Sequence, residues 1–220
     1  MGFVDNIEMS LCLTLDNENS SDMFDMIHSN FLEVADIWTD KFLIGTDFKD
    51  VDELPPAHAD SLKRESWTSR TNAYNAYRAH RAMIERAVEE GVENLLIVED
   101  DAVLRPSYFD SVVAEAGKFL DSNHWDMIYF GSYYRKYGSV EVAPNVLRLS
   151  GETGWHCVLL NQTMFGELLD LPALGPMDWM CSKMIHGNKM CYGLTPSVSL
   201  QLESYSNIQQ NTVSYNTFLV

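Results

Sequence analysis

Short apolar runs alternate along the chain with longer segments whose apolar residues recur at helical spacing. The runs at residues 7–17, 36–45, 95–98 and 125–134 predict strands. Amphipathic segments at 20–35, 69–91 and 106–123 predict helices, and shorter helices are expected over 162–171 and 175–187. Residues 142–161 predict a hairpin or two strands around the turn Ser150-Gly151-Glu152, and residues 189–201 a late strand.

Strands that alternate with helices in this way predict an α/β fold with a mainly parallel central sheet flanked by helices. No internal repeat and no linker interrupts the pattern over the 220 residues. We therefore expect residues 1–220 to form one domain, either alone or as part of a longer protein.

Composition removes several classes of function. The formal net charge of −17 argues against nucleic acid or an anionic membrane as a partner, because both favour a basic face. No apolar run approaches the roughly 20 residues needed to cross a bilayer. The N-terminus has no basic region followed by an apolar core, as a secretory signal would, so a cytoplasmic protein is expected. The four cysteines form no C-x-x-C pair, which predicts buried, reduced thiols and no zinc site.

The stretch "NLLIVEDDAVL", residues 94–104, carries the main chemical signal. A buried strand ends in Glu99, Asp100 and Asp101, and apolar residues resume at Ala102. Ligands of open α/β sheets bind outside the carboxyl ends of strands, so these acids are placed for a site. One interpretation is that they cap the next helix. The other is a hard-cation site, because carboxylates suit Mg²⁺ or Mn²⁺ together with substrate phosphates.

Four blocks in order resemble the GT-A glycosyltransferases, and glycosyltransferase family 25 in particular, the lipopolysaccharide and procollagen galactosyltransferase type. The first is "LIVEDDAVL" preceded by a helix with "AHRAMIERAVEEG". The others are "SGETGWHCVLLNQTMFGELLDL", "PMDWMCSKM" and "LTPSVSLQLESYSNIQ", so that the resemblance covers roughly residues 72–210. It implies a Rossmann-like GT-A fold and transfer of a sugar from a nucleotide-sugar donor.

The resemblance also implies roles for the acids. Asp101 would bind Mn²⁺ (or Mg²⁺) directly, Glu99 would contact the metal or the ribose, and Asp100 would face the donor sugar. GT-A folds hold the nucleobase and ribose at the end of the first strand, which here carries Thr14 and Asp16.

The helix before the acids departs from the family. In place of Gly-x-x-Gly-Cys-x-x-Ser-His, this chain has Asn72, Asn75, Ala76 and Ala79 and keeps only His80. The donor sugar is therefore left open. His80 and Arg78 on this helix are candidates for donor binding. Arg78 is the candidate for the donor diphosphate, because the guanidinium fork matches phosphate oxygens.

Asp178, at the start of the predicted helix 175–187, is the candidate general base, since an inverting transfer needs one carboxylate to take the acceptor proton. The alternative is that Asp178 only caps that helix. Trp155, His156 and Trp179 are candidates for contact with donor or acceptor sugars, although a His beside Trp and Cys is also typical of a core. Many GT-A enzymes use a late His as a further metal ligand, and His186 is the only His after residue 156. On a helix it is equally expected at the surface, so no role is predicted for it.

The sequence thus predicts a metal-dependent glycosyltransferase that moves a sugar, from a UDP-sugar by expectation, to the hydroxyl of a glycan, lipid-linked or protein acceptor with inversion. A metal-dependent phosphoester hydrolase or nucleotidyltransferase is the alternative enzyme. A catalytically inactive GT-A binding module is the alternative outside enzymes. A P-loop kinase is excluded, because the chain lacks G-x-x-x-x-G-K-[ST].

Overall fold

The computed structural model describes residues 2–15, 18–44, 56, 70–132, 139–206 and 211–213. Up to the acidic triplet the elements are η1 (Phe3–Asn6), β1 (Met9–Leu15), α1 (Glu18–Ala35), β2 (Asp40–Ile44), α3 (Arg70–Glu90) and β3 (Asn94–Glu99). They are followed by β4 (Ala102–Leu104), α4 (Pro106–Leu120), β5 (Met127–Tyr129), β6 (Val140–Ala143), β7 (Val146–Arg148), β8 (Cys157–Asn161), η3 (Gln162–Met164), α5 (Phe165–Leu169), α6 (Met177–Met184), β9 (Cys191–Leu194), β10 (Ser199–Gln201), β11 (Ser204–Ser206) and β12 (Asn211–Val213).

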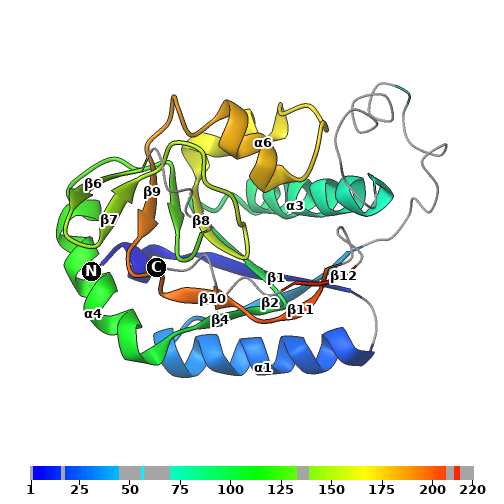
Figure 1. Ribbon diagram of the computed structural model, residues 1–220, viewed down its shortest axis with the longest axis horizontal. Helices are drawn as coiled ribbons and strands as arrows, with labels where there is room; N and C mark the ends of the chain where they lie inside the picture. Colours follow the sequence, from blue (N-terminus) through cyan, green and yellow to red (C-terminus); the bar gives the residue numbers. More distant parts are fainter. Residues whose placement is uncertain are drawn as a thin grey trace.

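A central sheet runs in the order β2-β1-β3-β8-β5-β9-β7-β6 (Figure 1). The strands β2, β1 and β3 pair in parallel, as do β5 and β9. Strand β8 lies antiparallel between β3 and β5, and β7 and β6 extend the far edge in antiparallel fashion. The predicted α/β class is confirmed. The parallel pairing holds for these two groups of strands, and β8 makes the sheet as a whole mixed.

Helices cover both faces of the sheet, which Figure 1 shows as α1 on one side and α3 and α6 on the other. Successive side chains of a strand point to opposite faces, so each strand feeds two cores. Leu95 and Ile97 of β3 pack with Met83 of α3, whereas Leu96 and Val98 pack in the cluster that holds α1 and α4. A strand buried on both faces has no polar alternation, which explains the continuous apolar run before Glu99.

The end of α3 shows how the sequence sets a boundary. Gly91 has φ 71°, a left-handed conformation that glycine adopts without steric cost. Its N–H donates to Val88 O, and the N–H of Val92 donates to Ala87 O, which satisfies carbonyls at the helix end. The predicted stop at Gly91 is confirmed.

Within residues 142–161 the strands β7 and β8 do not pair with each other. The predicted alternative of a hairpin around Ser150-Gly151-Glu152 is therefore wrong. Strand β7 pairs with β6 and β9, whereas β8 pairs with β3 and β5. The tight turn lies earlier, at Asn145, whose φ of 63° suits asparagine. Ser150–Glu152 therefore belongs to a crossing between two parts of the sheet.

The strand expected over residues 36–45 begins later, because β2 runs over Asp40–Ile44, and Gly45 lies outside the described residues. The four cysteines are free and buried, as expected of reduced thiols. Among the helices that the structure describes, none combines the length and the apolar character needed to traverse a bilayer.

Gly131, two residues after β5, lies where two other segments meet. A Cβ at this position would stand 2.3 Å from the main-chain oxygen of Ser199 and 2.5 Å from Nε2 of His156. No real Cβ contact is that short, and the nearer atom is backbone, so only glycine lets the chain pass here.

Gly131→Ala should therefore destabilise the fold by about 1–3 kcal/mol, the usual cost of forcing extra volume into a packed interior. Urea unfolding measures the difference. Gly166→Ala in α5 is the matched control, because a Cβ there meets nothing within 4 Å and alanine favours the helix. Equal midpoints for the two variants would contradict the prediction.

Candidate functional site

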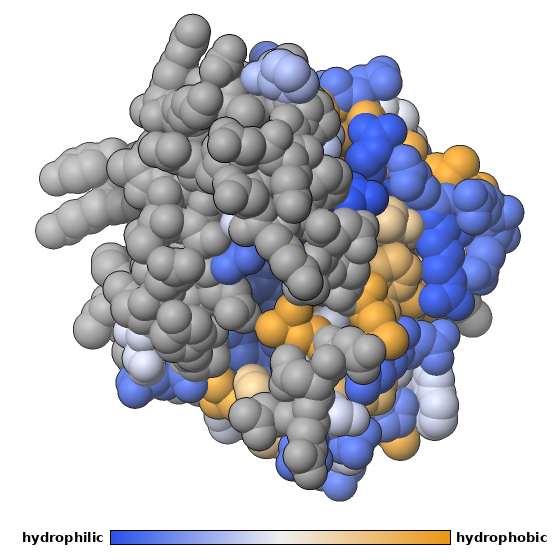
Figure 2. Space-filling model, turned by 90° about the vertical axis from the view of Figure 1, so that its right-hand side faces the viewer, coloured by the Kyte–Doolittle hydropathy of each residue, from blue (hydrophilic) through white to orange (hydrophobic). Residues whose placement is uncertain are grey.

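The acidic triplet lies at the carboxyl end of β3, beside the end of β1. Leu13 of β1 is in register with Glu99, and the N–H of Asp100 donates to Leu13 O at 3.2 Å. Strand β1 points to the right in Figure 1, and Figure 2 shows the molecule from that side, where hydrophilic and apolar described residues lie next to each other. Carboxyl ends of neighbouring parallel strands are the usual place for a ligand in an α/β sheet.

Glu99 and Asp101 face one shared donor, the side-chain amide of Gln201. Its Nε2 lies 2.9 Å from Asp101 Oδ2 and 3.4 Å from Glu99 Oε2. Gln201 is placed there because β10 pairs antiparallel with β4, which sets it opposite Ala102. Only 7% of Asp101 is exposed, whereas the Glu99 side chain keeps 30% of its surface exposed. Two carboxyl groups thus converge on the same neutral amide.

Asp100 turns away from this pair toward the end of β1. Its Oδ2 accepts a hydrogen bond of 3.0 Å from Thr14 Oγ1, and Thr14 also lies 3.2 Å from the carbonyl oxygen of Ser20 in α1. The structure therefore brings the predicted residues Thr14 and Asp100 together. Asp16 lies outside the described residues.

The carboxyl groups at this edge resist ionisation. Burial raises the pKa of Glu99 well above its usual value, and the charges of Asp101, Asp178 and Asp100 raise it further. Burial also raises the pKa of Asp100, against the hydrogen bond from Thr14. Positive charge placed among these groups would relieve their repulsion.

Asp178 occupies the first turn of α6 with both carboxyl oxygens hydrogen-bonded. The N–H of Gly154 donates to Oδ2 at 3.1 Å, and the N–H of Trp179 donates to Oδ1 at 2.7 Å. Burial raises the pKa of Asp178, and these two hydrogen bonds oppose the rise. The N-cap of α6 is Pro176 and no side chain caps this end, so Asp178 does not cap the helix as the alternative expects. It binds the N–H of the next residue from within the first turn, and its charge reaches Glu99.

His80 of α3 lies beside Glu99 at the carboxyl end of β3. Its Nε2 lies 3.6 Å from Glu99 Oε1, and its ring stands edge-on to Trp155 at 5.4 Å between centroids. Burial lowers the pKa of His80 to about 4, so the ring is neutral at pH 7 and the contact with Glu99 is no ion pair. Arg78, on the same helix, is exposed.

Trp155 and His156 are core residues in this structure, with 1% and 0% of their surface exposed. The indole Nε1 of Trp155 donates to Tyr129 Oη at 2.8 Å, and the His156 main-chain oxygen accepts from the N–H of Glu99 at 2.8 Å. The stacking wall expected of Trp155 is therefore not formed, because the ring has no open face. Trp179 is half-buried, with the Lys183 ammonium 5.9 Å from its ring.

His186 lies in the interior and not on a helix surface, which was one of the two alternatives left open for it. It follows the end of α6, is 1% exposed, and lies 2.8 Å through Nε2 from Tyr129 Oη. Its Nδ1 is 3.9 Å from Oε2 of the equally buried Glu152. Glu152 was not predicted as a site residue, because a Glu in the polar run "SGET" is typical of a solvated turn.

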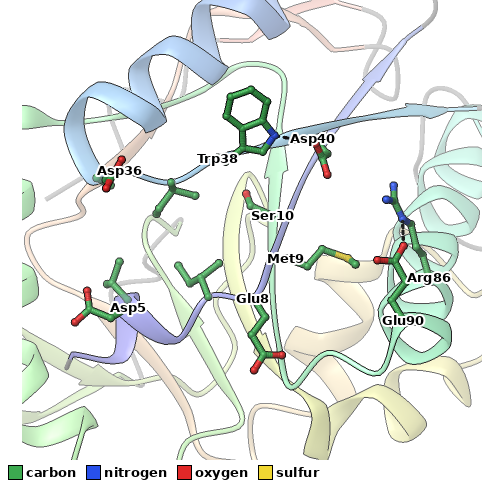
Figure 3. Close-up of a pocket in the computed structure, with 13 residues that line it drawn as sticks. Asp5, Glu8, Met9, Ser10, Asp36, Trp38, Asp40, Arg86 and Glu90 are labelled. Carbon is green, nitrogen blue, oxygen red and sulfur yellow. Dashed lines mark hydrogen bonds and ion pairs between the residues drawn. The ribbon is translucent and has the colours of Figure 1, made fainter.

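A cavity of about 520 Å³ lies at the amino ends of β1 and β2, at the other end of these strands from the acidic triplet (Figure 3). The ends of α1 and α3 complete its wall, and the labelled residues include Trp38, Asp40, Arg86 and Glu90. Trp38 Nε1 donates to Asp40 Oδ1 at 3.0 Å, and Arg86 pairs with Glu90 at 2.7 Å. None of the predicted site residues lines this cavity, so it is separate from the acidic triplet.

Within the described ranges, no three His, Cys, Asp or Glu side chains are grouped so that they could hold a metal ion by themselves. Mg²⁺ and Mn²⁺ sites at phosphate esters commonly use only one or two carboxylates and are completed by the substrate. Glu99 and Asp101, which converge on one amide donor, fit that smaller donor set.

No protein-family model and no curated protein matches this chain. Among solved structures, A197 from STIV is similar over 89% of this chain and 86% of its own, with 14% identity and a TM-score of 0.47. A glycosyltransferase involved in the glycosylation of the major capsid of PBCV-1 is similar over 80% of this chain and 68% of its own, with 11% identity and a TM-score of 0.38. The inositol-1-phosphate CTP transferase from T. maritima is similar over 89% and 90%, with 9% identity and a TM-score of 0.36.

All three TM-scores are below 0.5, so no conclusion about this chain rests on these likenesses. The resemblance to glycosyltransferase family 25 stays a prediction from the sequence.

Three buried imidazoles should be neutral at pH 6. Burial lowers the pKa of His80, His156 and His186 to about 4 each. Because the unfolded chain takes up these protons first, near pH 6.5, their contribution to stability is complete above that pH and is lost as the pH falls to about 4. Nitrogen-15 NMR of the rings at pH 6 measures this, with the urea-unfolded chain as control. Protonated rings in the folded protein at pH 6 would contradict it.

Proposed function

We propose that this protein is a metal-dependent glycosyltransferase that moves a sugar from a nucleotide-sugar donor, a UDP-sugar by expectation, to an acceptor hydroxyl. The acceptor class is a glycan, a lipid-linked glycan or a protein. The observation that carries the proposal is the convergence of Glu99 and Asp101 on one amide group at the carboxyl end of β3, with Asp178 close enough to raise the pKa of Glu99.

Glu99 and Asp101 are the residues that would hold Mn²⁺ or Mg²⁺. When bound, the cation supplies positive charge that offsets both the carboxylates and the charge that develops on the leaving diphosphate. Gln201 would keep the two side chains aimed at the same point, because its amide donates to both.

Thr14 and Asp100 would form the donor end of the site, beside β1. Their hydrogen bond fixes the Asp100 carboxyl, which would accept from hydroxyls of the donor sugar. Arg78 is exposed on α3, and its guanidinium offers a bidentate fork for phosphate oxygens.

Asp178 is the proposed general base. It would take the proton of the acceptor hydroxyl as that oxygen attacks the anomeric carbon and the bond from that carbon to the diphosphate breaks. The raised pKa of Asp178 favours proton uptake, because a base is most effective when its pKa approaches the working pH. Two N–H donors fix the carboxyl, and lone pairs remain on its oxygens for the acceptor. The half-buried ring of Trp179 lies next to it and is the proposed contact for an acceptor sugar.

Release of nucleoside diphosphate from a panel of nucleotide sugars, with Mn²⁺ or with EDTA, tests the metal and the donor together. We expect turnover of one donor, lost in EDTA and reduced about 100-fold or more in Asp101→Asn, since a neutral amide is a poorer ligand for a hard cation. Asp110→Asn on the exposed face of α4 is the matched control and should match the wild type.

The other functions give different results in the same assay. Turnover that is unchanged in EDTA would contradict the metal site. Release of nucleoside monophosphate and sugar phosphate would indicate the hydrolase alternative. Mn²⁺-dependent binding of a nucleotide without any turnover, over a panel of acceptors, would indicate the inactive binding module.

Asp178→Asn should lower kcat by about 10²–10⁴-fold, because the amide keeps the shape of the side chain but cannot take a proton. The KM of the donor should change less than about threefold, since the donor contacts lie at β1 and β3. Steady-state kinetics measures both values, and Asp170→Asn, exposed just after α5, is the control. A variant with full kcat would remove Asp178 as the base and leave it only its hydrogen bonds to Gly154 and Trp179.

A further inference from the structure

The crossing between β7 and β8 is organised by a buried carboxyl group, that of Glu152. Only 1% of Glu152 is exposed. Its Oε2 accepts from the N–H of Ser150 at 2.7 Å and from the N–H of Gly151 at 2.8 Å, and the hydroxyl of Ser139 donates to Oε1. A carboxyl group in the interior is costly unless it is fully hydrogen-bonded, and here it takes its donors from the turn itself.

The turn that Glu152 closes is bound to α6, the helix that carries Asp178. Ser182 Oγ donates to the carbonyl oxygen of Gly151 at 2.8 Å. Three residues later, the N–H of Gly154 donates to Asp178 Oδ2 at 3.1 Å. The segment Ser150–Gly154 is thus hydrogen-bonded to α6 at Gly151 and again at Gly154.

Gly154 makes the second attachment possible. Its φ of 105° lies in a region that side chains of L-residues rarely adopt, so the chain bends there and directs the N–H toward Asp178. A backbone in such a conformation persists only where the surroundings hold it. On one side that support is Trp155, which follows directly and donates to Tyr129 Oη at 2.8 Å.

His186 supports the other side of Glu152 without charge. Its Nδ1 lies 3.9 Å from Glu152 Oε2, and its Nε2 lies 2.8 Å from Tyr129 Oη. Burial lowers the pKa of His186 to about 4, and the positive Arg148 contributes, so the ring is neutral at pH 7. Glu152 is therefore held by hydrogen-bond geometry and needs no ionised partner here.

We propose that Glu152 is a positioning residue: by closing the turn at Ser150 and Gly151 it directs the Gly154 N–H and so orients the Asp178 carboxyl group. The structural part of this inference concerns a main-chain hydrogen bond and stands without any activity. The catalytic part rests on the proposed function, in which Asp178 is the base.

Two substitutions separate the shape of Glu152 from its removal. In Glu152→Gln the carbonyl oxygen can accept from both N–H groups and the new NH₂ can donate to the Ser139 hydroxyl, whereas Glu152→Ala loses all three hydrogen bonds. We expect exchange of the Gly154 amide hydrogen, relative to that of Leu96 in β3, to become about tenfold faster or more in Glu152→Ala and to stay within about threefold of wild type in Glu152→Gln.

Kinetics gives the readout that a general loss of stability would not. Glu152→Ala should lower kcat about 10- to 100-fold with the KM of the donor within about twofold, and Glu152→Gln should restore kcat, since a misplaced base affects the chemical step more than donor binding. Asp178→Ala calibrates the exchange measurement, because it removes the acceptor of the Gly154 N–H directly.

Ser182→Ala keeps the proposal testable where Glu152→Ala fails to fold, because it removes only the attachment of Gly151 to α6. Faster Gly154 exchange in Ser182→Ala, with Glu152→Gln like wild type, supports the proposal. Wild-type exchange of Gly154 in Ser182→Ala, or a Glu152→Gln variant that exchanges as fast as Asp178→Ala, overturns it. If these exchange results hold while no donor is turned over by wild type, the positioning stands and the proposed function fails.

Discussion

Repulsion among carboxyl groups that are held close together at one sheet edge is the constraint on which the site depends. Burial and the charges of Asp101, Asp178 and Asp100 raise the pKa of Glu99, and the neutral amide of Gln201 lies within hydrogen-bond distance of both Glu99 and Asp101. Holding these carboxyl groups together costs free energy in the folded protein. In the proposed function, a bound cation would offset that cost.

The rest of the fold serves to hold these groups against their repulsion. Strand β3 is buried on both faces, so its end cannot shift without disturbing the clusters that hold α1 and α3. The parallel pairing with β1 places Leu13 opposite Glu99, and the pairing of β10 with β4 brings Gln201 from the far end of the chain. Close packing of this kind resists small displacements, which is why a site of like charges can persist.

The local parts of this arrangement were predicted from the sequence, and the long-range parts were not. The apolar run of residues 95–98 followed by three acids, and the stop of α3 at Gly91, depend on neighbours along the chain, and both were predicted. The antiparallel insertion of β8 was not, because strand order depends on which surfaces pack once the chain has folded. The burial of Glu152, His186 and Trp155 was missed for the same reason, since their hydrogen bonds join segments 26 to 57 residues apart or lie within a turn whose burial leaves no sequence pattern.

Acidic residues alone do not distinguish a site in a chain with a net charge of −17, as the two edges of the sheet illustrate. At the amino edge the carboxyl groups around the cavity find donors close by, with Asp40 bound to Trp38 and Glu90 to Arg86. At the carboxyl ends, Glu99 and Asp101 face one shared amide, and the charge of Asp101 helps to raise the pKa of Glu99. Asp40 and Glu90 thus each have a donor of their own, whereas Glu99 and Asp101 share the amide of Gln201. This difference is the reason that the cation of the proposed function is expected at the carboxyl ends and not in the cavity at the amino ends.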